Sequence, residues 1–170
     1  VGTVVFIGSV YAPRSGFLEE LGERLAARGI TLRVNGDKYG TSNEDYWRTL
    51  ATSGVLVTTT LQGMPRAGMD WIWIQQLVFR FSEALAAGAV LVAPSVDGGD
   101  RFFTPGEEIL VARDGKDVAD HLSSLSRDRA ERIGLAALDK VLTRHTYASR
   151  AVEVDDVLRV QRLQRQRHAR

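Results

Sequence analysis

Three short segments contain residues whose types and spacing could bind a ligand. The first holds Gly8 and Ser9 and reaches Arg14, directly ahead of a helix that Ser15 is predicted to cap. Backbone N–H groups at a helix N-terminus bind anions, and a guanidinium forms charge-assisted hydrogen bonds with phosphate. This segment therefore predicts a diphosphate site. The alternative is a plain strand-to-helix turn with a surface arginine.

The other two segments lie further along the chain. Arg80 and Glu83 are three residues apart, which puts them on one face of the helix expected there, among few other polar groups. Gly98 and Gly99 lie between two aspartates, and a second turn follows at 103–107, so the backbone can approach a ligand closely. For Arg80 and Glu83, the alternative is an ion pair on a solvated helix face.

Several other chemistries are excluded by the sequence. The turn at 8–13 contains one glycine, so it lacks the dinucleotide fingerprint, and neither a P-loop nor a G-x-S-x-G nucleophile elbow is present. The absence of cysteine excludes disulfides, thiolate zinc sites and cysteine nucleophiles. The histidines lie far apart without metal-ligand spacing, and His121 and His145 are expected to be surface or packing residues.

Short apolar strands alternate with amphipathic helices along the chain. This pattern predicts an α/β fold: a single doubly wound, Rossmann-like domain with a mainly parallel sheet of about five strands, followed by C-terminal helices. In such a sheet, ligands bind at the carboxyl ends of the strands, which is where the polar segments lie. The five expected strands are 3–7, 30–34, 55–59, 89–93 and 109–112.

The helices are expected between and after these strands. Thr41 or Ser42 is predicted to cap the second helix. A polar loop at 62–70 is expected to lead into a long apolar helical segment at 71–87, ended by Gly88. Three more helices are expected at about 116–125, 127–143 and 147–163.

Composition and charge set further limits. With 170 residues, 44% of them hydrophobic and 25% charged, the chain is expected to form one globular domain. No apolar run is long enough for a transmembrane helix and the N-terminus lacks signal-peptide features, so a cytoplasmic location is expected. Residues 159–170 contain five arginines and no acid, which leaves a charge of −4 on residues 1–158. The acidic body argues against a nucleic-acid partner, and the basic tail is expected to be solvated and frayed.

Three stretches of the sequence together resemble a known enzyme family. They are RFSEALAAGA at 80–89, FFTPGEEILVARD at 102–114 and RHTYASRA at 144–151. In this order they are similar to the C-terminal, nucleotide-sugar-binding half of GT-B glycosyltransferases, closest to the spore-maturation-protein type and related to glycosyltransferase families one and four. The opening FIGSVYAPRSGFLEEL also resembles the first strand and loop of that half, so the similarity covers residues 4–158.

The resemblance implies roles for individual residues. Glu83 matches the helix glutamate that binds the ribose hydroxyls of the nucleotide, and a carboxylate can accept two strong hydrogen bonds from that diol. Arg14 matches a basic residue near the donor diphosphate. Gly8 and Ser9 would supply backbone contacts to the same group.

Other positions match the family less fully. Arg80 would be a second basic group or would orient Glu83, while Gly98 and Gly99 would approach the donor sugar or its phosphate. Retaining members of related families carry a second glutamate eight residues before the first, where this chain has Gln75. An amide can hold a sugar hydroxyl but lacks the charge of a carboxylate, so retention and inversion of the anomeric configuration both stay open.

As a whole, the resemblance implies a donor-binding domain that takes part in transferring a sugar from a nucleotide diphospho-sugar to an acceptor, without a metal or other cofactor. Residues 1–158 would form this domain and 159–170 a basic extension. The enzyme would be longer, with an N-terminal GT-B half that supplies the acceptor base, so the isolated chain is expected to fold but not to transfer sugar. A non-catalytic nucleotide-binding or interaction module of the same fold is the alternative, and half of a sugar-nucleotide epimerase is another.

Overall fold

Five strands form one parallel sheet in the order β2-β1-β3-β6-β7. The computed structural model describes residues 2–11, 14–35, 42–59, 61–66, 69–75 and 80–168. The strands of the sheet are β1 (Thr3–Ile7), β2 (Thr31–Asn35), β3 (Val55–Val57), β6 (Val90–Ala93) and β7 (Leu110–Val111). Their pairings are all parallel, which confirms the predicted α/β fold. The strand order changes direction between β1 and β3, and doubly wound sheets generally bind ligands at the carboxyl ends of the strands at such a point.

Helices cover both faces of this sheet because the central strands β1, β3 and β6 are apolar on both sides. Alternate side chains of a strand point to opposite faces, so Val4 packs with Leu21 and Leu122 on one face. On the other face, Val5 packs in a second cluster that includes Leu85. The covering helices are α1 (Arg14–Ala26) and α4 (Gly115–Ser124) on the first face, and α2 (Asn43–Thr52), α3 (Arg80–Ala86) and α5 (Arg127–Arg144) on the second.

The predicted helix caps are correct at α2 and wrong at α1. Ser42 caps α2, where its hydroxyl accepts a hydrogen bond from the Asp45 N–H at 3.1 Å. Ser15 does not cap α1, because this helix already begins at Arg14. The Ser15 N–H instead donates to the Tyr11 carbonyl at 2.9 Å, as part of the first helical turn. Arg14 is therefore the first helical residue after β1.

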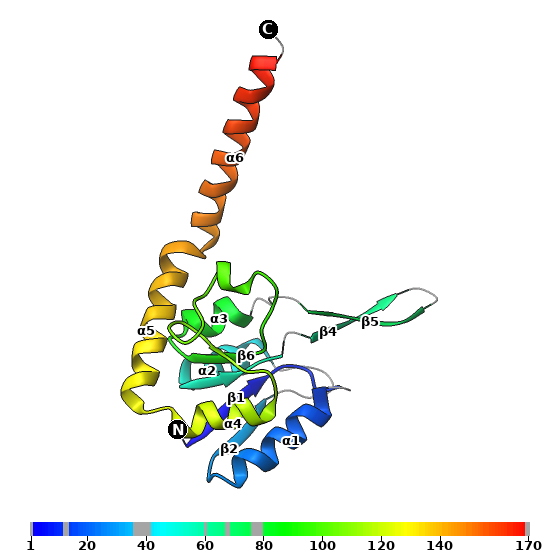
Figure 1. Ribbon diagram of the computed structural model, residues 1–170, viewed down its shortest axis with the longest axis vertical. Helices are drawn as coiled ribbons and strands as arrows, with labels where there is room; N and C mark the ends of the chain where they lie inside the picture. The colour runs from blue at the N-terminus through cyan, green and yellow to red at the C-terminus, as the bar shows by residue number, and fades with distance from the viewer. Residues whose placement is uncertain are drawn as a thin grey trace.

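A β-hairpin replaces the loop predicted at 62–70 and the first half of the helix predicted at 71–87. The strands β4 (Leu61–Arg66) and β5 (Met69–Gln75) pair antiparallel as a separate two-stranded sheet (Figure 1). The prediction failed because a short apolar run does not distinguish a strand from a helix by its periodicity. The run Trp71-Ile72-Trp73-Ile74 consists of aromatic and β-branched residues, which favour strands. Helix α3 begins only at Arg80.

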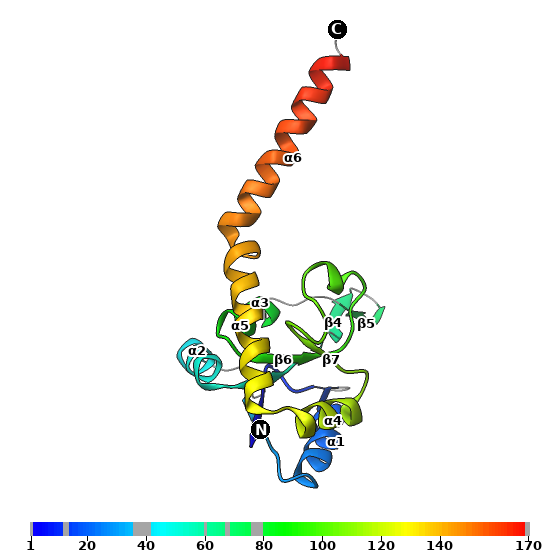
Figure 2. The same ribbon diagram turned by 60° about the vertical axis from the view of Figure 1, so that its left-hand side comes forward.

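The last helix, α6 (Tyr147–His168), extends away from the sheet and its covering helices (Figures 1 and 2). The expectation of a frayed tail is wrong for residues 159–168, which continue this helix. The expectation of a solvated tail is correct for its described side chains, since those from Ala151 onward are exposed. In the part of the chain described above, no helix is both long and apolar enough to cross a membrane.

Helix α5 passes very close to the turn that joins α3 to β6. A Cβ atom on Gly134 would lie 2.4 Å from the carbonyl oxygen of Gly88, far inside van der Waals contact. Gly88 itself has a φ of +72°, a backbone conformation that residues with a Cβ atom rarely adopt. The two glycines together allow α5 to pack against this turn.

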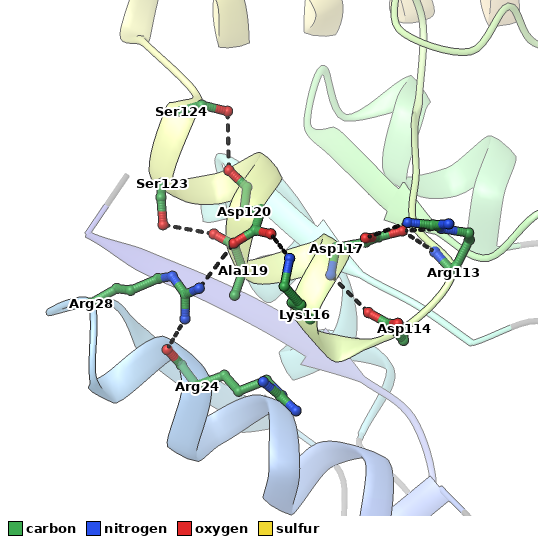
Figure 3. Close-up of polar contacts among 10 residues, drawn as sticks. All are labelled: Arg24, Arg28, Arg113, Asp114, Lys116, Asp117, Ala119, Asp120, Ser123 and Ser124. Carbon is green, nitrogen blue, oxygen red and sulfur yellow. Dashed lines mark hydrogen bonds and ion pairs between the residues drawn. The ribbon is translucent and has the colours of Figure 1, made fainter.

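Charged side chains at the start of α4 form the cluster in Figure 3. The Arg113 guanidinium donates to Asp117 twice, from Nε to Oδ2 at 2.6 Å and from Nη2 to Oδ1 at 3.1 Å. These bonds favour the charged carboxylate and lower the pKa of Asp117 to about 2. Asp120 accepts from Arg28 at 2.9 Å and so joins α4 to the turn that follows α1. Its pKa is also lowered, first by the hydrogen bond from Lys116.

We predict that Gly134→Ala lowers the free energy of unfolding by about 1–3 kcal/mol, because the added methyl group would push α5 away from the Gly88 carbonyl. Gly22→Ala is the matched control within α1. Its Cβ would meet the nearest atom at 3.9 Å, an ordinary contact. Alanine there should raise stability by about 0.5–1 kcal/mol through its higher helix propensity. Urea denaturation measures both, and equal effects would contradict the close approach of α5.

The lowered pKa of Asp117 predicts a pH dependence. A carboxyl group with a folded-state pKa below its ordinary value of 3.8 stabilises the fold above about pH 4, and that contribution is lost as the pH falls toward 2. We expect Arg113→Gln to raise the NMR titration midpoint of Asp117 from about 2 toward 3.8. The substitution should also lower stability more at pH 6 than at pH 2. Arg132→Gln, at an exposed position of α5, should change neither quantity, and an unchanged midpoint in Arg113→Gln would rule out the assigned cause.

Candidate functional site

The first loop of the candidate site follows β1 at the carboxyl edge of the sheet. Gly8 has a φ of 145°, which glycine adopts far more readily than other residues, and its N–H donates to the Asn35 carbonyl at 3.1 Å. The Ser9 carbonyl accepts a hydrogen bond from Nη1 of Arg14 at 2.9 Å. The structure thus brings together the three residues predicted to form a diphosphate site, Gly8, Ser9 and Arg14.

Arg14 is held in place by aromatic rings as well as by this loop. Its Cζ lies 4.5 Å from the centroid of the Tyr11 ring and 5.7 Å from that of the Phe6 ring. Both distances are within the range of cation–π attraction. The guanidinium is partly buried, so part of its hydration is replaced by these contacts. The result is a fixed positive charge at the end of the first strand.

A cavity of about 350 Å³ lies beside the turn that follows β6. Gly98 and Gly99 line it, together with the apolar residues Phe81, Phe103 and Ile109. Gly98 has a φ of 72° and begins a single 3-10 turn over Gly99–Arg101. The two glycines therefore adopt the close-set turn that the sequence predicted. Because β1 and β6 are parallel strands of one sheet, this cavity and Arg14 lie at the same carboxyl edge.

The loop after this turn is anchored to α5 by a partly buried ion pair. Oε2 of Glu108 accepts from the Thr104 N–H and from Nζ of Lys140, each at 2.6 Å. The two side chains of the pair are 15% and 26% exposed, so water screens their attraction less than that of the other ion pairs. Glu108 is the last residue of the family-like stretch Phe103-x-Pro105-Gly106-x-Glu108, and this contact gives it a structural role.

A second set of contacts, from His145 and Arg150, holds Phe102 in this loop. Nη2 of Arg150 lies 2.7 Å from Nδ1 of His145, and Nε2 of His145 lies 3.1 Å from the Phe102 carbonyl. Because an arginine only donates, Nδ1 must accept and Nε2 must carry the proton that goes to Phe102. Arg150 also lies over the Phe102 ring, with Cζ 5.4 Å from its centroid. His145 is therefore a packing residue, as the sequence predicted.

Glu83 lies on α3, as predicted, but it does not line the cavity beside Gly98 and Gly99. It is partly buried and accepts a short hydrogen bond from the Tyr46 hydroxyl of α2. With Trp47, it lines a separate groove of about 500 Å³ between α2, α3 and α5. Tyr46 could not be predicted from the sequence, because a contact across 37 residues leaves no local signal.

Two other predicted residues can be placed by their backbone alone. Gln75 is the last residue of β5 and Arg80 is the first of α3. Their side chains lie outside the described part of the structure. Within the described residues, no group of three or more histidine, aspartate or glutamate side chains could hold a metal ion.

Two threonines at the carboxyl edge of the sheet were not among the predicted site residues. Thr58 and Thr59 follow β3 directly, and their hydroxyl oxygens are buried with no hydrogen-bond partner. The signal in the sequence was a run of three threonines directly after an apolar strand.

Comparison with known proteins agrees with this arrangement. A family model described as glycosyl transferase-like matches residues 14–156. The chain belongs to this family. Comparison of this glycosyl transferase-like domain with curated proteins gives no match.

Two solved structures resemble the glycosyl transferase-like domain. The C-terminal domain of a glycosyl transferase group 1 family protein, LpcC from Francisella tularensis, is 11% identical with a TM-score of 0.50, over 86% of this chain and 87% of that one. AviGT4, a glycosyltransferase involved in avilamycin A biosynthesis, is 17% identical with a TM-score of 0.51, over 89% of this chain. The match spans 52% of AviGT4, about half its length. At identities this low, the two matches show only the fold, which is that of a GT-B C-terminal domain. The resemblance to the spore-maturation type stays a prediction.

We predict that Arg150→Ala loosens the turn of the cavity. Without the guanidinium, Nδ1 of His145 loses its donor and the Phe102 ring loses its cation, at a cost of about 1–3 kcal/mol. Hydrogen exchange should quicken at the Phe102 and Phe103 amides, both of which donate to the Gly99 carbonyl. Arg144→Ala, six residues earlier and exposed, is the control. Equal protection of these amides in both variants would show that Arg150 does not hold the loop.

Proposed function

We propose that this domain binds a nucleotide diphospho-sugar and serves as the donor-binding half of a glycosyltransferase. The observation that carries the proposal is the fixed guanidinium of Arg14 beside Gly8 and Ser9, at the switch point of the sheet. A diphosphate carries at least two negative charges, and a guanidinium gains more from such a partner when aromatic rings already hold it in place. Membership in the glycosyl transferase-like family supports this choice among anionic ligands.

In the proposed reaction, the bond between the sugar's anomeric carbon and the diphosphate oxygen breaks, and an acceptor oxygen takes its place. Negative charge develops on the leaving nucleoside diphosphate. Arg14 and the nearby backbone N–H groups would stabilise that charge more strongly in the transition state than in the ground state, which is what accelerates a reaction. The acceptor's proton would pass to a base on a second, N-terminal half. The match to only half of AviGT4 supports such a partner half.

Glu83 is proposed to bind the ribose of the same nucleotide. Its Oε2 already accepts from the Tyr46 hydroxyl, which fixes the direction of the carboxylate. An ionised carboxylate has about four acceptor positions, so oxygen lone pairs remain for a cis-diol. Tyr46 would act on the ligand only through Glu83.

Titration with UDP, GDP, ADP and dTDP, and with the matching nucleosides, tests the proposal. Arg14→Ala should weaken binding of the diphosphate more than that of the nucleoside, and this difference should shrink as salt rises, because part of it is Coulombic. Glu83→Ala should weaken both ligands by about tenfold to a hundredfold, or about 1.5–3 kcal/mol, since both contain the ribose.

Glu131→Ala is the matched control, because Glu131 is exposed on α5 and distant in sequence from the proposed site. It should bind both ligands like the parent. If the parent binds none of the four diphosphates, the proposed function is wrong. If Arg14→Ala binds diphosphate and nucleoside like the parent, the phosphate site must lie elsewhere on the domain.

A further inference from the structure

The hydroxyls of Thr58 and Thr59 are buried at the end of the central strand without a hydrogen-bond partner. Thr58 is 3% exposed, and the oxygen atoms of both side chains are out of contact with solvent. Neither hydroxyl meets a donor or an acceptor in the structure described above. Because nearly all buried polar groups in native proteins are paired, two unpaired hydroxyls on consecutive residues require an explanation.

The backbone holds these two residues between β1 and β6. The Thr58 N–H donates to the Val92 carbonyl at 3.0 Å, so Thr58 extends the pairing of β3 beyond its last assigned residue. Phe6 is paired with Val57, and continuing this parallel register sets Thr58 beside Ile7 and Thr59 beside Gly8. The threonines therefore lie at the switch point of the sheet, next to the loop that contains Gly8 and Ser9.

The two side chains are expected on opposite faces of the sheet. Alternation along the strand puts Thr58 on the side of Leu56, which packs in the same cluster as Phe81 of the cavity beside Gly98 and Gly99. Thr59 follows on the side of Val57, the face covered by α1, whose first residue is Arg14. A ligand that crosses the end of β3 would therefore meet one hydroxyl on each side.

We propose that Thr58 and Thr59 donate hydrogen bonds to phosphoryl oxygens of the bound nucleoside diphosphate. This inference rests on the proposed function and adds two binding residues to it. A phosphoryl oxygen only accepts hydrogen bonds, and an unpaired hydroxyl has a proton to donate. Arg14 at the same edge supplies the charge that neutral hydroxyls lack.

The unpaired hydroxyls also affect the stability of the protein without ligand. An unpaired buried hydroxyl destabilises the fold, whereas a methyl group of the same shape does not. Thr→Val substitution replaces that hydroxyl by a methyl group. Thr58→Val and Thr59→Val should therefore raise the stability of the ligand-free protein and weaken diphosphate binding, two effects of opposite sign.

Thr49 provides the matched control. It is a threonine 5% exposed, close to Thr58 in burial, but its hydroxyl accepts from Nδ2 of Asn35 at 2.6 Å. Thr49→Val removes a hydrogen bond that is made, so it should lower stability.

The experiment compares the parent chain with Thr58→Val, Thr59→Val and Thr49→Val. Thermal unfolding without ligand should give a Tm raised by about 2–4 °C in the first two variants and lowered in Thr49→Val. Calorimetric titration with whichever of UDP, GDP, ADP or dTDP the parent binds should show affinity reduced about tenfold by Thr58→Val and by Thr59→Val. Affinity for the matching nucleoside should stay the same.

Three outcomes would overturn the inference. A Tm lowered by Thr58→Val and Thr59→Val, as by Thr49→Val, would show that the hydroxyls are already paired. Unchanged diphosphate affinity, or equal losses for diphosphate and nucleoside, would show that they do not contact phosphate, and the proposed function would stand. A parent that binds no nucleoside diphosphate would remove the proposed function and this inference together.

Discussion

The burial of both faces of a parallel sheet is the constraint on which this structure depends. Once α1 and α4 cover one face and α2, α3 and α5 the other, polar groups that must reach a ligand are confined to the edges of the sheet. The carboxyl edge is where the N-termini of helices and the least regular loops lie. Arg14, the glycine turn after β6 and the two threonines after β3 share that edge for this reason, although they are far apart in sequence.

The stretches that carry the family resemblance serve two purposes in the fold. Glu108, His145 and Arg150 hold the loop after β6 against α5 and α6, through an ion pair and a chain of hydrogen bonds. These residues shape the site without lining its cavity. Arg14, from the opening stretch, lies instead at the carboxyl edge of the sheet, next to the loop of Gly8 and Ser9. Residues of a family-like motif can therefore hold a loop in place and need not contact a ligand.

How much could be predicted from the sequence depended on the range of the interactions. The strands of the sheet were predicted within one or two residues because most of them are short apolar runs, and four of the five end at glycine, asparagine, threonine or proline. The hairpin of β4 and β5 was missed because the periodicity of the short apolar run at 71–74 does not distinguish a strand from a helix. At the site, Arg14 with Gly8 and Ser9 was predictable since the contact is local. The pairing of Tyr46 with Glu83 and the unpaired state of Thr58 depend on tertiary packing, which no spacing in the sequence encodes.

Helix α6 is long, so a small change of its angle at the junction after His145 produces a large displacement at its far end. Its 22 residues span about 33 Å, so a tilt of roughly 10° at its base moves the far end by about 6 Å. Arg150 is in the first turn of this helix, where it contacts both His145 and the Phe102 ring. These contacts place the base of α6 against the loop beside the cavity. A tilt of α6 about its base would therefore move the Arg150 side chain, and with it the Phe102 loop, by much less than it moves the far end of the helix.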